Sequence, residues 1–172
     1  YLAAADDDVQ KQWVLCYDRA TGKPIWKTTI HEGGFPKKMN SRASNASSSL
    51  AWDGERLFIN FLHDKAVYTT ALDPKGKQLW QTKITDYVLH QGYGSSPAIY
   101  KHLVIVSADN KGGGALCGLN RTDGKIIWRQ ERPKLPNYPS PIILTAAGKE
   151  QLILTGCEKI VSYDPLTGQV NW

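Results

Sequence analysis

Three long polar segments of the sequence gather the residues that could bind a ligand. They are 31–47, 86–95 and 131–139, and they combine aromatic rings, amides and basic groups. These groups suit a sugar, an anionic small molecule or a peptide segment of a protein, because rings stack while amides and cations donate hydrogen bonds. The candidate ligand-binding residues are His31, Lys37, Lys38, Asn40, Arg42, His90, Tyr93, Asn137 and Tyr138. The alternative interpretation is that they are ordinary rim residues bonded to one another and to water.

The sequence gives little support for a catalytic or metal site. The four histidines lack the spacing of a metal pair such as HxxxH, and no GxSxG motif surrounds a serine. The glycine-rich stretches GYGSS and KGGGA lack the helix and lysine of a phosphate-binding loop. Asp6, Asp7 and Asp8 form an acidic cluster that a solvated turn explains. His63 and His102 lie beside expected turns, so both are interpreted as surface residues.

Cysteine usage and charge exclude several further classes. Cys16, Cys117 and Cys157 form no CxxC pair and do not support a disulfide framework. The net charge of +5 is modest for 172 residues, and no nucleic-acid motif is present, so a nucleic-acid partner is not expected. No apolar run reaches the roughly 18 residues of a membrane span, so no such span is expected.

A phrase repeated four times indicates the elements that position the candidate residues. It reads DRATGKPIW at 18–26, DPKGKQLW at 73–80, NRTDGKIIW at 120–128 and DPLTGQVNW at 164–172. Asp or Asn opens each copy, and a Gly stands four residues before a closing Trp. The intervals between these tryptophans are 54, 48 and 44 residues. Self-similarity at such a period is typical of a repeat fold.

Each copy predicts a strand, a tight turn and a second strand. Asp and Asn side chains accept bonds from N–H groups two residues on, and Gly supplies a positive φ. A Ser-led element upstream of three copies, which begins at Ser48, Ser95 and Ser140, adds two more strands. The predicted strands are 48–52, 56–61, 66–72 and 77–84 in one unit, and 96–100, 102–107, 114–119 and 125–130 in the next.

Four short antiparallel strands in about 45 residues match one blade of a β-propeller. We therefore predict an all-β protein with four-stranded antiparallel blades. The predicted ranges are a blade part at 1–30, blades at 47–86 and 94–132, and a blade part at 139–172. Each repeated Trp falls in the outermost strand and is expected to pack on the next blade, where its indole N–H needs an acceptor. The polar segments that join the blades would then share one face, where binding residues concentrate.

The repeat resembles that of the PQQ-binding-like, or quinoprotein-type, β-propeller proteins, where PQQ is pyrroloquinoline quinone. The stretches WVLCYDRATGKPIWKTTIHEGG, HQGYGSSPAIYKHLVIVSADN and QLILTGCEKIVSYDPLTGQVNW look like three successive blade segments of that family. Related repeats occur in the envelope assembly factor BamB and in quinoprotein alcohol dehydrogenases. The resemblance covers essentially the whole chain and implies seven or eight blades. About three and a half blades are then present, and the chain is expected to be a piece of a larger bacterial protein of the periplasm or cell envelope.

The fold alone does not fix the function. A PQQ enzyme needs Ca²⁺ held by oxygen ligands and an Asp base, and the family resemblance adds an adjacent Cys-Cys pair that this chain lacks. The favoured interpretation is a non-catalytic binding or protein-interaction scaffold without a cofactor. The alternatives are part of a PQQ-dependent dehydrogenase, with PQQ and calcium held outside this segment, and a BamB-like envelope assembly factor.

Overall fold

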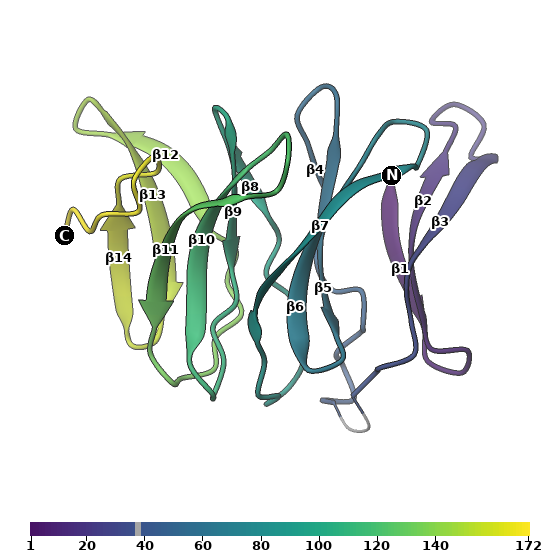
Figure 1. Ribbon diagram of the computed structural model, residues 1–172, viewed down its shortest axis with the longest axis horizontal. Coiled ribbons are helices and arrows are strands. Elements are labelled where there is room, and N and C mark those ends of the chain that lie inside the picture. The colour runs from purple at the N-terminus through teal and green to yellow at the C-terminus, as the bar shows by residue number, and fades with distance from the viewer. Residues whose placement is uncertain (37–38) are drawn as a thin grey trace.

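The computed structural model describes residues 1–36 and 39–172, which form strands and turns and no helix (Figure 1). This described part accordingly offers no helix of the length and apolarity that crossing a membrane requires. The strands are β1 (Leu2–Asp6), β2 (Lys11–Tyr17), β3 (Pro24–Glu32), β4 (Ala51–Trp52), β5 (Leu57–His63), β6 (Ala66–Leu72), β7 (Gln78–Asp86), β8 (Ala98–Tyr100), β9 (Leu103–Ser107), β10 (Gly114–Asn120), β11 (Ile126–Arg132), β12 (Ile142–Ala146), β13 (Lys149–Gly156) and β14 (Lys159–Tyr163).

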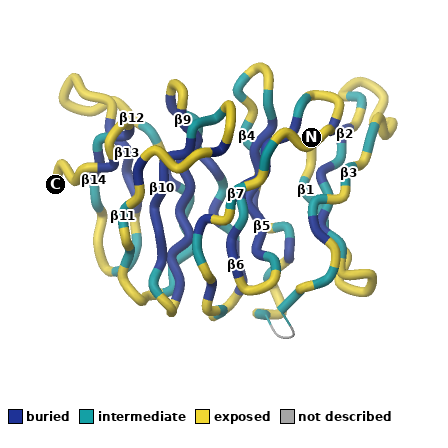
Figure 2. Tube along the Cα trace, in the orientation of Figure 1, coloured by how far each residue is buried: buried dark blue, intermediate teal, exposed yellow. Residues whose placement is uncertain are grey.

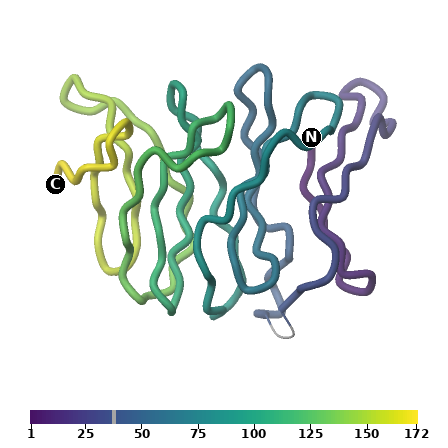
Figure 3. Tube along the Cα trace, viewed as in Figure 1, coloured from purple at the N-terminus to yellow at the C-terminus, as the bar shows by residue number. Residues whose placement is uncertain are grey.

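The strands form four antiparallel sheets that stand side by side in chain order (Figures 1 and 3). We call them the first blade (β1–β3), the second blade (β4–β7), the third blade (β8–β11) and the fourth blade (β12–β14). Within each blade every strand pairs with the next strand of the chain, so short turns suffice to connect them. The second and third blades have four strands each, which confirms the predicted all-β architecture of antiparallel propeller blades.

Several strands are shorter than the sequence predicted, among them those predicted at 48–52 and 96–100. Only Ala51–Trp52 of the predicted strand 48–52 pairs with β5. The serines before it serve another purpose, because Ser49 N donates to Ser96 Oγ in the next blade at 2.9 Å. Ser96 N in turn donates to Ser140 Oγ at 2.9 Å, so these hydroxyls link three successive blades. The segment 169–172, where the fourth copy of the repeated phrase predicts its second strand, is reduced to a bridge between Tyr163 and Val170, with further backbone bonds to Ser162.

The hydrophobic core lies at the three junctions between neighbouring blades (Figure 2). Strand β5 shows the reason, since alternate residues of a strand point to opposite faces of its sheet. Leu57, Ile59 and Phe61 pack toward the first blade, whereas Phe58 and Leu62 pack toward the third. All of these side chains are buried. A middle strand therefore reads as a continuous apolar run instead of an alternating one.

The repeated phrase forms the turn before the outer strand of each blade. In the first copy, Asp18 Oδ1 accepts bonds from the N–H groups of Ala20 at 3.1 Å and Thr21 at 2.7 Å. Gly22 follows with a φ of 68°, where a side chain would be strained. In the other three copies, the side-chain Oδ1 of Asp73, Asn120 or Asp164 likewise accepts a bond from the backbone N–H two residues later. The turn chemistry predicted from the sequence is therefore present in all four copies.

The outer-strand tryptophans dock each blade on the next, as predicted. Trp26 Nε1 donates to Pro74 O in the second blade at 3.0 Å. Its ring also covers Gly76, where an added Cβ would lie only 2.8 Å from the ring. Trp80 Nε1 donates to Arg121 O in the third blade at 3.1 Å. The glycine is thus required by the close approach of the ring as well as by its own backbone conformation.

The third junction departs from this pattern. Trp128 covers Gly168 of the fourth blade, but its buried Nε1 has no hydrogen-bond partner among the described residues. The cause lies in the strand beside it. Gly118 faces Trp128, whereas the first two blades have Cys16 and Ala71 opposite their tryptophans. A Cβ at Gly118 would overlap the indole nitrogen, so this ring lies deeper against its own sheet.

Candidate functional site

The three connections between blades lie together at one end of the sheets. Each leads from the last strand of one blade to the first strand of the next, over 33–50, 87–97 and 133–141. Because the strands are antiparallel and repeat in order, all three connections emerge at the same end, the lower edge in Figure 1. We call this end the connection face. The turns made by the repeated phrase lie at the opposite end.

A cavity of about 390 Å³ lies where all three connections meet, and we call it the first cavity. Its size falls within the range of small-ligand sites. The lining residues are Asn40, Arg42, Ala43, Ser47, Gln91, Gly92, Tyr93, Gly94 and Tyr138. Four of the nine predicted binding residues therefore lie around one cavity, and these are Asn40, Arg42, Tyr93 and Tyr138.

Buried tyrosines shape the second connection. Tyr93 donates its hydroxyl to Ser107 O at 2.8 Å and meets the ring of Tyr87 edge-on, with 5.7 Å between the centroids. Tyr87 in turn donates to Gly92 O at 2.7 Å and closes 87–92 into a compact loop. Burial raises the pKa of both tyrosines, so both hydroxyls keep their protons and these bonds. The wall of the first cavity is thus fixed by the core beneath it.

Backbone bonds join the first connection to the second. Asn40 N donates to Gln91 O at 3.1 Å, and Asn40 Oδ1 accepts from Arg42 N at 2.9 Å. Gly92 approaches Ala43 closely, since an added Cβ would lie 3.1 Å from the Cβ of Ala43. The exposed guanidinium of Arg42 forms no ion pair or hydrogen bond with the described residues. Its backbone is therefore held while its charge faces solvent at the cavity.

The third connection contributes the ring of Tyr138. His90 Nδ1 lies 2.8 Å from the Tyr138 hydroxyl, and the two rings are nearly parallel at 18°. Burial raises the pKa of Tyr138, although the backbone N–H of Gln91 opposes this shift. His90 does not line the first cavity itself. Instead, His90 contacts and positions Tyr138, which lines the first cavity.

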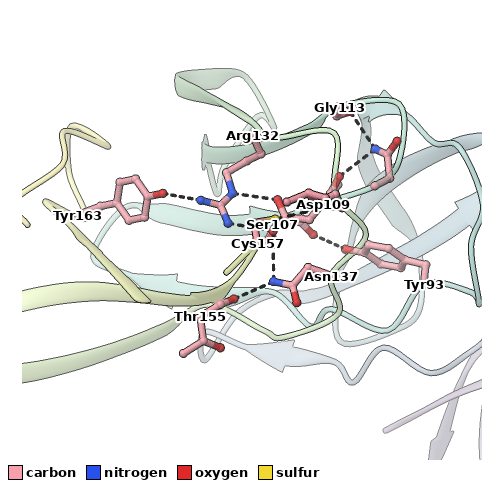
Figure 4. Close-up of polar contacts among 12 residues, drawn as sticks. Tyr93, Ser107, Asp109, Gly113, Arg132, Asn137, Thr155, Cys157 and Tyr163 are labelled. Atoms are coloured by element: carbon pink, nitrogen blue, oxygen red, sulfur yellow. Dashed lines mark hydrogen bonds and ion pairs between the residues drawn. The ribbon is translucent and has the colours of Figure 1, made fainter. Parts of the chain in front are cut away.

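Asn137, next to Tyr138, joins a buried polar network instead of the cavity wall (Figure 4). At its centre, Arg132 Nε and Nη2 donate to the two oxygens of Asp109 at 2.9 and 3.0 Å. Their side chains are only 6% and 1% exposed. Arg132 Nη1 also donates to the Tyr163 hydroxyl at 2.8 Å. Burial alone would lower the pKa of Arg132, but the Asp109 carboxylate raises it above its usual value, so the pair remains charged.

Two further groups complete this network. Asn137 Nδ2 donates to Thr155 O at 2.8 Å and lies 3.4 Å from Asp109 Oδ2. Cys157 Sγ also lies 3.4 Å from Asp109 Oδ2. Burial and then the nearby carboxylate raise the pKa of Cys157 to about 11, so the thiol stays protonated and is a poor nucleophile. The network fixes the third connection to the fourth blade.

His31 is not part of the connection face, contrary to the sequence interpretation. Strand β3 continues to Glu32 and carries His31 into the first junction, where it is 7% exposed. His63, predicted to be a surface residue, is half-buried and stacks on His31 with centroids 4.3 Å apart and planes 5° apart. The prediction failed because both side chains point between two sheets from positions that looked like strand ends.

The hydrogen bonds of His31 fix its neutral tautomer. Gln12 Nε2 donates to the carbonyls of Asn45 and Leu62, so its Oε1 faces His31 Nδ1 at 2.9 Å and must accept that proton. His31 Nε2 is left to accept from Gln81 Nε2 at 3.1 Å. Burial and then the neighbouring His63 lower the pKa of His31 to about 4. His31 therefore serves the packing of the first two blades.

The remaining predicted site residues and the acidic cluster form no site in the described part of the chain. Lys37 and Lys38 lie outside the described residues. Asp6 caps a turn by accepting from Asp8 N at 3.0 Å and Val9 N at 3.2 Å, as expected for a solvated turn. Across residues 1–36 and 39–172, no three His, Cys, Asp or Glu side chains gather closely enough to hold a metal ion.

The sequence interpretation missed the buried ion pair of Arg132 and Asp109 and several residues that line the first cavity, such as Gln91. Arg132 lay within the polar segment 131–139, beyond the strand predicted at 125–130. A usable signal was present in the repeat. Arg132 stands four residues after its Trp, where the first two copies have Ile30 and Ile84. A charge at a position that is apolar in its sister copies predicts a buried partner.

Comparisons with known proteins give three findings. The family described as outer membrane protein assembly factor BamB matches residues 10–172. A curated relative, the outer membrane protein assembly factor BamB of Nitrosomonas eutropha, is 26% identical over 174 residues, which cover 99% of this chain and 36% of the relative. The chain thus spans about a third of that relative's length. A solved structure, a europium-containing methanol dehydrogenase, is similar with a TM-score of 0.48 and 20% identity over 71% of this chain and 23% of that one.

Proposed function

Because the chain belongs to the family of the outer membrane protein assembly factor BamB, we propose that it is a non-catalytic scaffold whose connection face binds another protein. The observation that carries this proposal is the meeting of all three connections around the first cavity. Loops held by a rigid scaffold are where binding residues concentrate. We further propose that the protein works in the cell envelope, in keeping with the name of its relative.

The chemistry of the first cavity suits binding. It offers the ring of Tyr138, the amides of Asn40 and Gln91, and the charge of Arg42. Each of these groups can contact a partner directly, because amides and guanidinium donate hydrogen bonds and the ring offers apolar area. Core and backbone contacts hold the surrounding connections, so little ordering is needed when a partner binds.

The same lining does not fit PQQ with a calcium ion. Calcium takes six to eight oxygen ligands, with carboxylates prominent among them. The described residues around the first cavity include no Asp or Glu. A PQQ-dependent dehydrogenase would therefore need its cation and its general base from other residues, and no step of quinone chemistry is assigned to this cavity.

Site-specific photo-crosslinking tests the proposed function. The photoreactive residue p-benzoylphenylalanine would replace exposed Gln91 on the connection face and, as a matched control, exposed Lys75 at the opposite end of the blades. In cells that make the full-length protein, a discrete protein adduct is expected at Gln91 and not at Lys75. Adducts of equal yield at both positions, or at neither, would contradict the proposal.

A thermal-shift titration of the full-length protein with PQQ, with and without Ca²⁺, tests the enzyme alternative. A ligand that binds only the folded state raises the unfolding temperature. We expect no saturable shift. A shift that requires both PQQ and Ca²⁺ would overturn the non-catalytic proposal.

A further inference from the structure

A second cavity of about 400 Å³ lies on the same connection face. Its lining residues are Gly34, Phe35, Pro36, Leu62, Asp64, Lys65, Tyr87 and Leu89. Apolar side chains predominate, and Leu62 and Tyr87 form a buried base at 6% and 5% exposure. The charges of Asp64 and Lys65 are adjacent in the chain and opposite in sign. The second cavity is therefore suited to an apolar side chain.

The two cavities are neighbours, because both draw lining residues from the segment 87–94. Tyr87 lines the second cavity, and its hydroxyl donates to Gly92 O in the wall of the first at 2.7 Å. Leu89 faces the second cavity, and Gln91, two residues on, faces the first. A third hollow of about 410 Å³ shares Phe35 and Pro36 with the second cavity and Asn40 and Ala43 with the first. The hollows thus follow one another along the first connection.

The two cavities differ in charge. Among residues 1–36 and 39–172, Arg42 is the sole charged side chain in the lining of the first cavity, and it has no acidic partner there. An unpaired guanidinium beside aromatic and amide groups favours a carboxylate, which it can bind through two parallel hydrogen bonds. A small anion alone would use the first cavity and leave the second empty. A sugar would match neither the charge of the first nor the apolar walls of the second.

We propose that the connection face binds an extended peptide segment of the partner protein, with an Asp or Glu carboxylate at Arg42 and a large apolar side chain in the second cavity. An extended chain suits this arrangement because its successive side chains project at a fixed spacing of about 3.3 Å per residue. Contacts of the two side chains then give specificity through charge and shape together. This inference rests on the proposed function and adds the chemistry of the bound segment.

Selection from a random dodecapeptide phage library on the full-length protein tests the inference. The wild-type protein should enrich peptides that combine an acidic residue with a large apolar residue a few positions away. The Arg42→Glu variant should instead enrich basic peptides with the same apolar residue. The Arg19→Glu variant is the matched control, since Arg19 is an exposed arginine in a turn at the opposite end of the blades. It should select the same peptides as the wild type.

Fluorescence anisotropy with a selected peptide then measures each contact. Arg42→Glu and Leu89→Ser should each weaken the Kd by about tenfold or more, and Arg42→Lys by only about threefold, because lysine keeps the charge without the paired donors. Glutamate should compete with the peptide and a neutral monosaccharide should not. Thermal unfolding of each variant checks that the fold is intact, above all for Leu89→Ser, because Leu89 is half-buried and packs against a core cluster.

Other outcomes overturn the inference in distinguishable ways. Enriched peptides without acidic residues, a Kd unchanged by Arg42→Glu, or competition by the sugar would each refute it. If Gln91 still crosslinks to a protein in any of these cases, the proposed function stands without the peptide chemistry. If neither peptides nor crosslinks are obtained, both proposals are wrong.

Discussion

The first two blade junctions differ from the third in the hydrogen bonds that join one blade to the next. At the first two, the Trp Nε1 donates to the next blade, and a threonine two residues later adds a second bond to the covered glycine. These bonds run from Thr28 Oγ1 to Gly76 O at 2.7 Å and from Thr82 Oγ1 to Gly124 O at 2.8 Å. At the third junction, Trp128 Nε1 has no partner, and Gln130 stands in place of the threonine.

The third junction replaces an apolar contact by an ion pair. Leu62 and Ile84 of the second blade are buried in one core cluster, at the junction with the third blade. By repeat position, Asp109 and Arg132 are their counterparts in the third blade. An apolar pair has no desolvation cost, whereas a buried ion pair stabilises only when its geometry and its further hydrogen bonds are nearly complete. The ion pair is therefore expected to stabilise the third junction less than an apolar pair would. In return it fixes the position of the connection that carries Tyr138.

The largest expected effect comes from breaking this ion pair. Asp109→Ala leaves the Arg132 guanidinium, whose side chain is 6% exposed, without its counter-charge. We expect the free energy of unfolding in urea to fall by about 3–5 kcal/mol. The double variant Asp109→Leu with Arg132→Ile restores the apolar pair of the second blade and should be as stable as the wild type or more stable. A cost of Asp109→Ala no larger than that of the exposed Asp8→Ala would contradict this account.

The first junction should respond to acid through His31. Its pKa is about 6.5 when unfolded and about 4 when folded, so the unfolded chain binds more protons between these values. The contribution of His31 is complete above pH 6.5 and is lost as the pH falls toward 4, by about 3 kcal/mol in total. Unfolding of the wild type and of His31→Gln, measured across this range, should show the steeper loss in the wild type. Equal slopes of the free energy of unfolding against pH in the two proteins would contradict the lowered pKa of His31.

The tryptophans provide a direct comparison of the junctions. Trp80→Phe keeps a ring but removes the bond from Nε1 to Arg121 O, so a loss of about 1 kcal/mol is expected from urea unfolding. Trp128→Phe removes an N–H without a partner and should cost clearly less. A larger loss for Trp128→Phe than for Trp80→Phe would contradict this account, because it would indicate that Trp128 Nε1 also donates a hydrogen bond.

The smallest effect is expected from Gly118→Ala, which gives the third blade the residue that the second has at Ala71. The new Cβ would displace the Trp128 ring outward. By repeat position, the expected acceptor for its indole N–H is the carbonyl of Pro165, the counterpart of Pro74 and Arg121 at the first two junctions. The new hydrogen bond stabilises the fold and the repacking strains it, so the free energy of unfolding should change by no more than about 1 kcal/mol. A crystal structure of the variant should show the new bond. An unmoved ring would contradict the role assigned to Gly118.

Much of the fold was predictable because its determinants are local. The Asp or Asn, the Gly and the Trp of each copy act within one turn or on the adjacent blade, so spacing alone indicated blades and their docking. The resemblance to the PQQ-binding-like repeat family is confirmed by the family match over residues 10–172. The expected total of seven or eight blades stays a prediction.

The site was less predictable because it depends on where the connections end and strands begin. His31 was assigned to a loop, but β3 runs through it and buries it beside Gln12. Asn137 was predicted to be a candidate ligand-binding residue, yet its side chain bonds Thr155 O of the fourth blade. Such partners lie tens of residues away in the chain, and no local pattern identifies them. Binding at Asn40, Arg42, Tyr93 and Tyr138 remains a proposal.

The division of each docking contact between two blades has an evolutionary consequence. Trp26 belongs to the first blade, but the glycine that it covers, Gly76, belongs to the second. A stretch of DNA that encodes one blade therefore encodes a glycine for the preceding neighbour and a tryptophan for the following one. Duplication of such a stretch inserts a blade whose two contacts already match, so the array can lengthen by whole units without compensating substitutions.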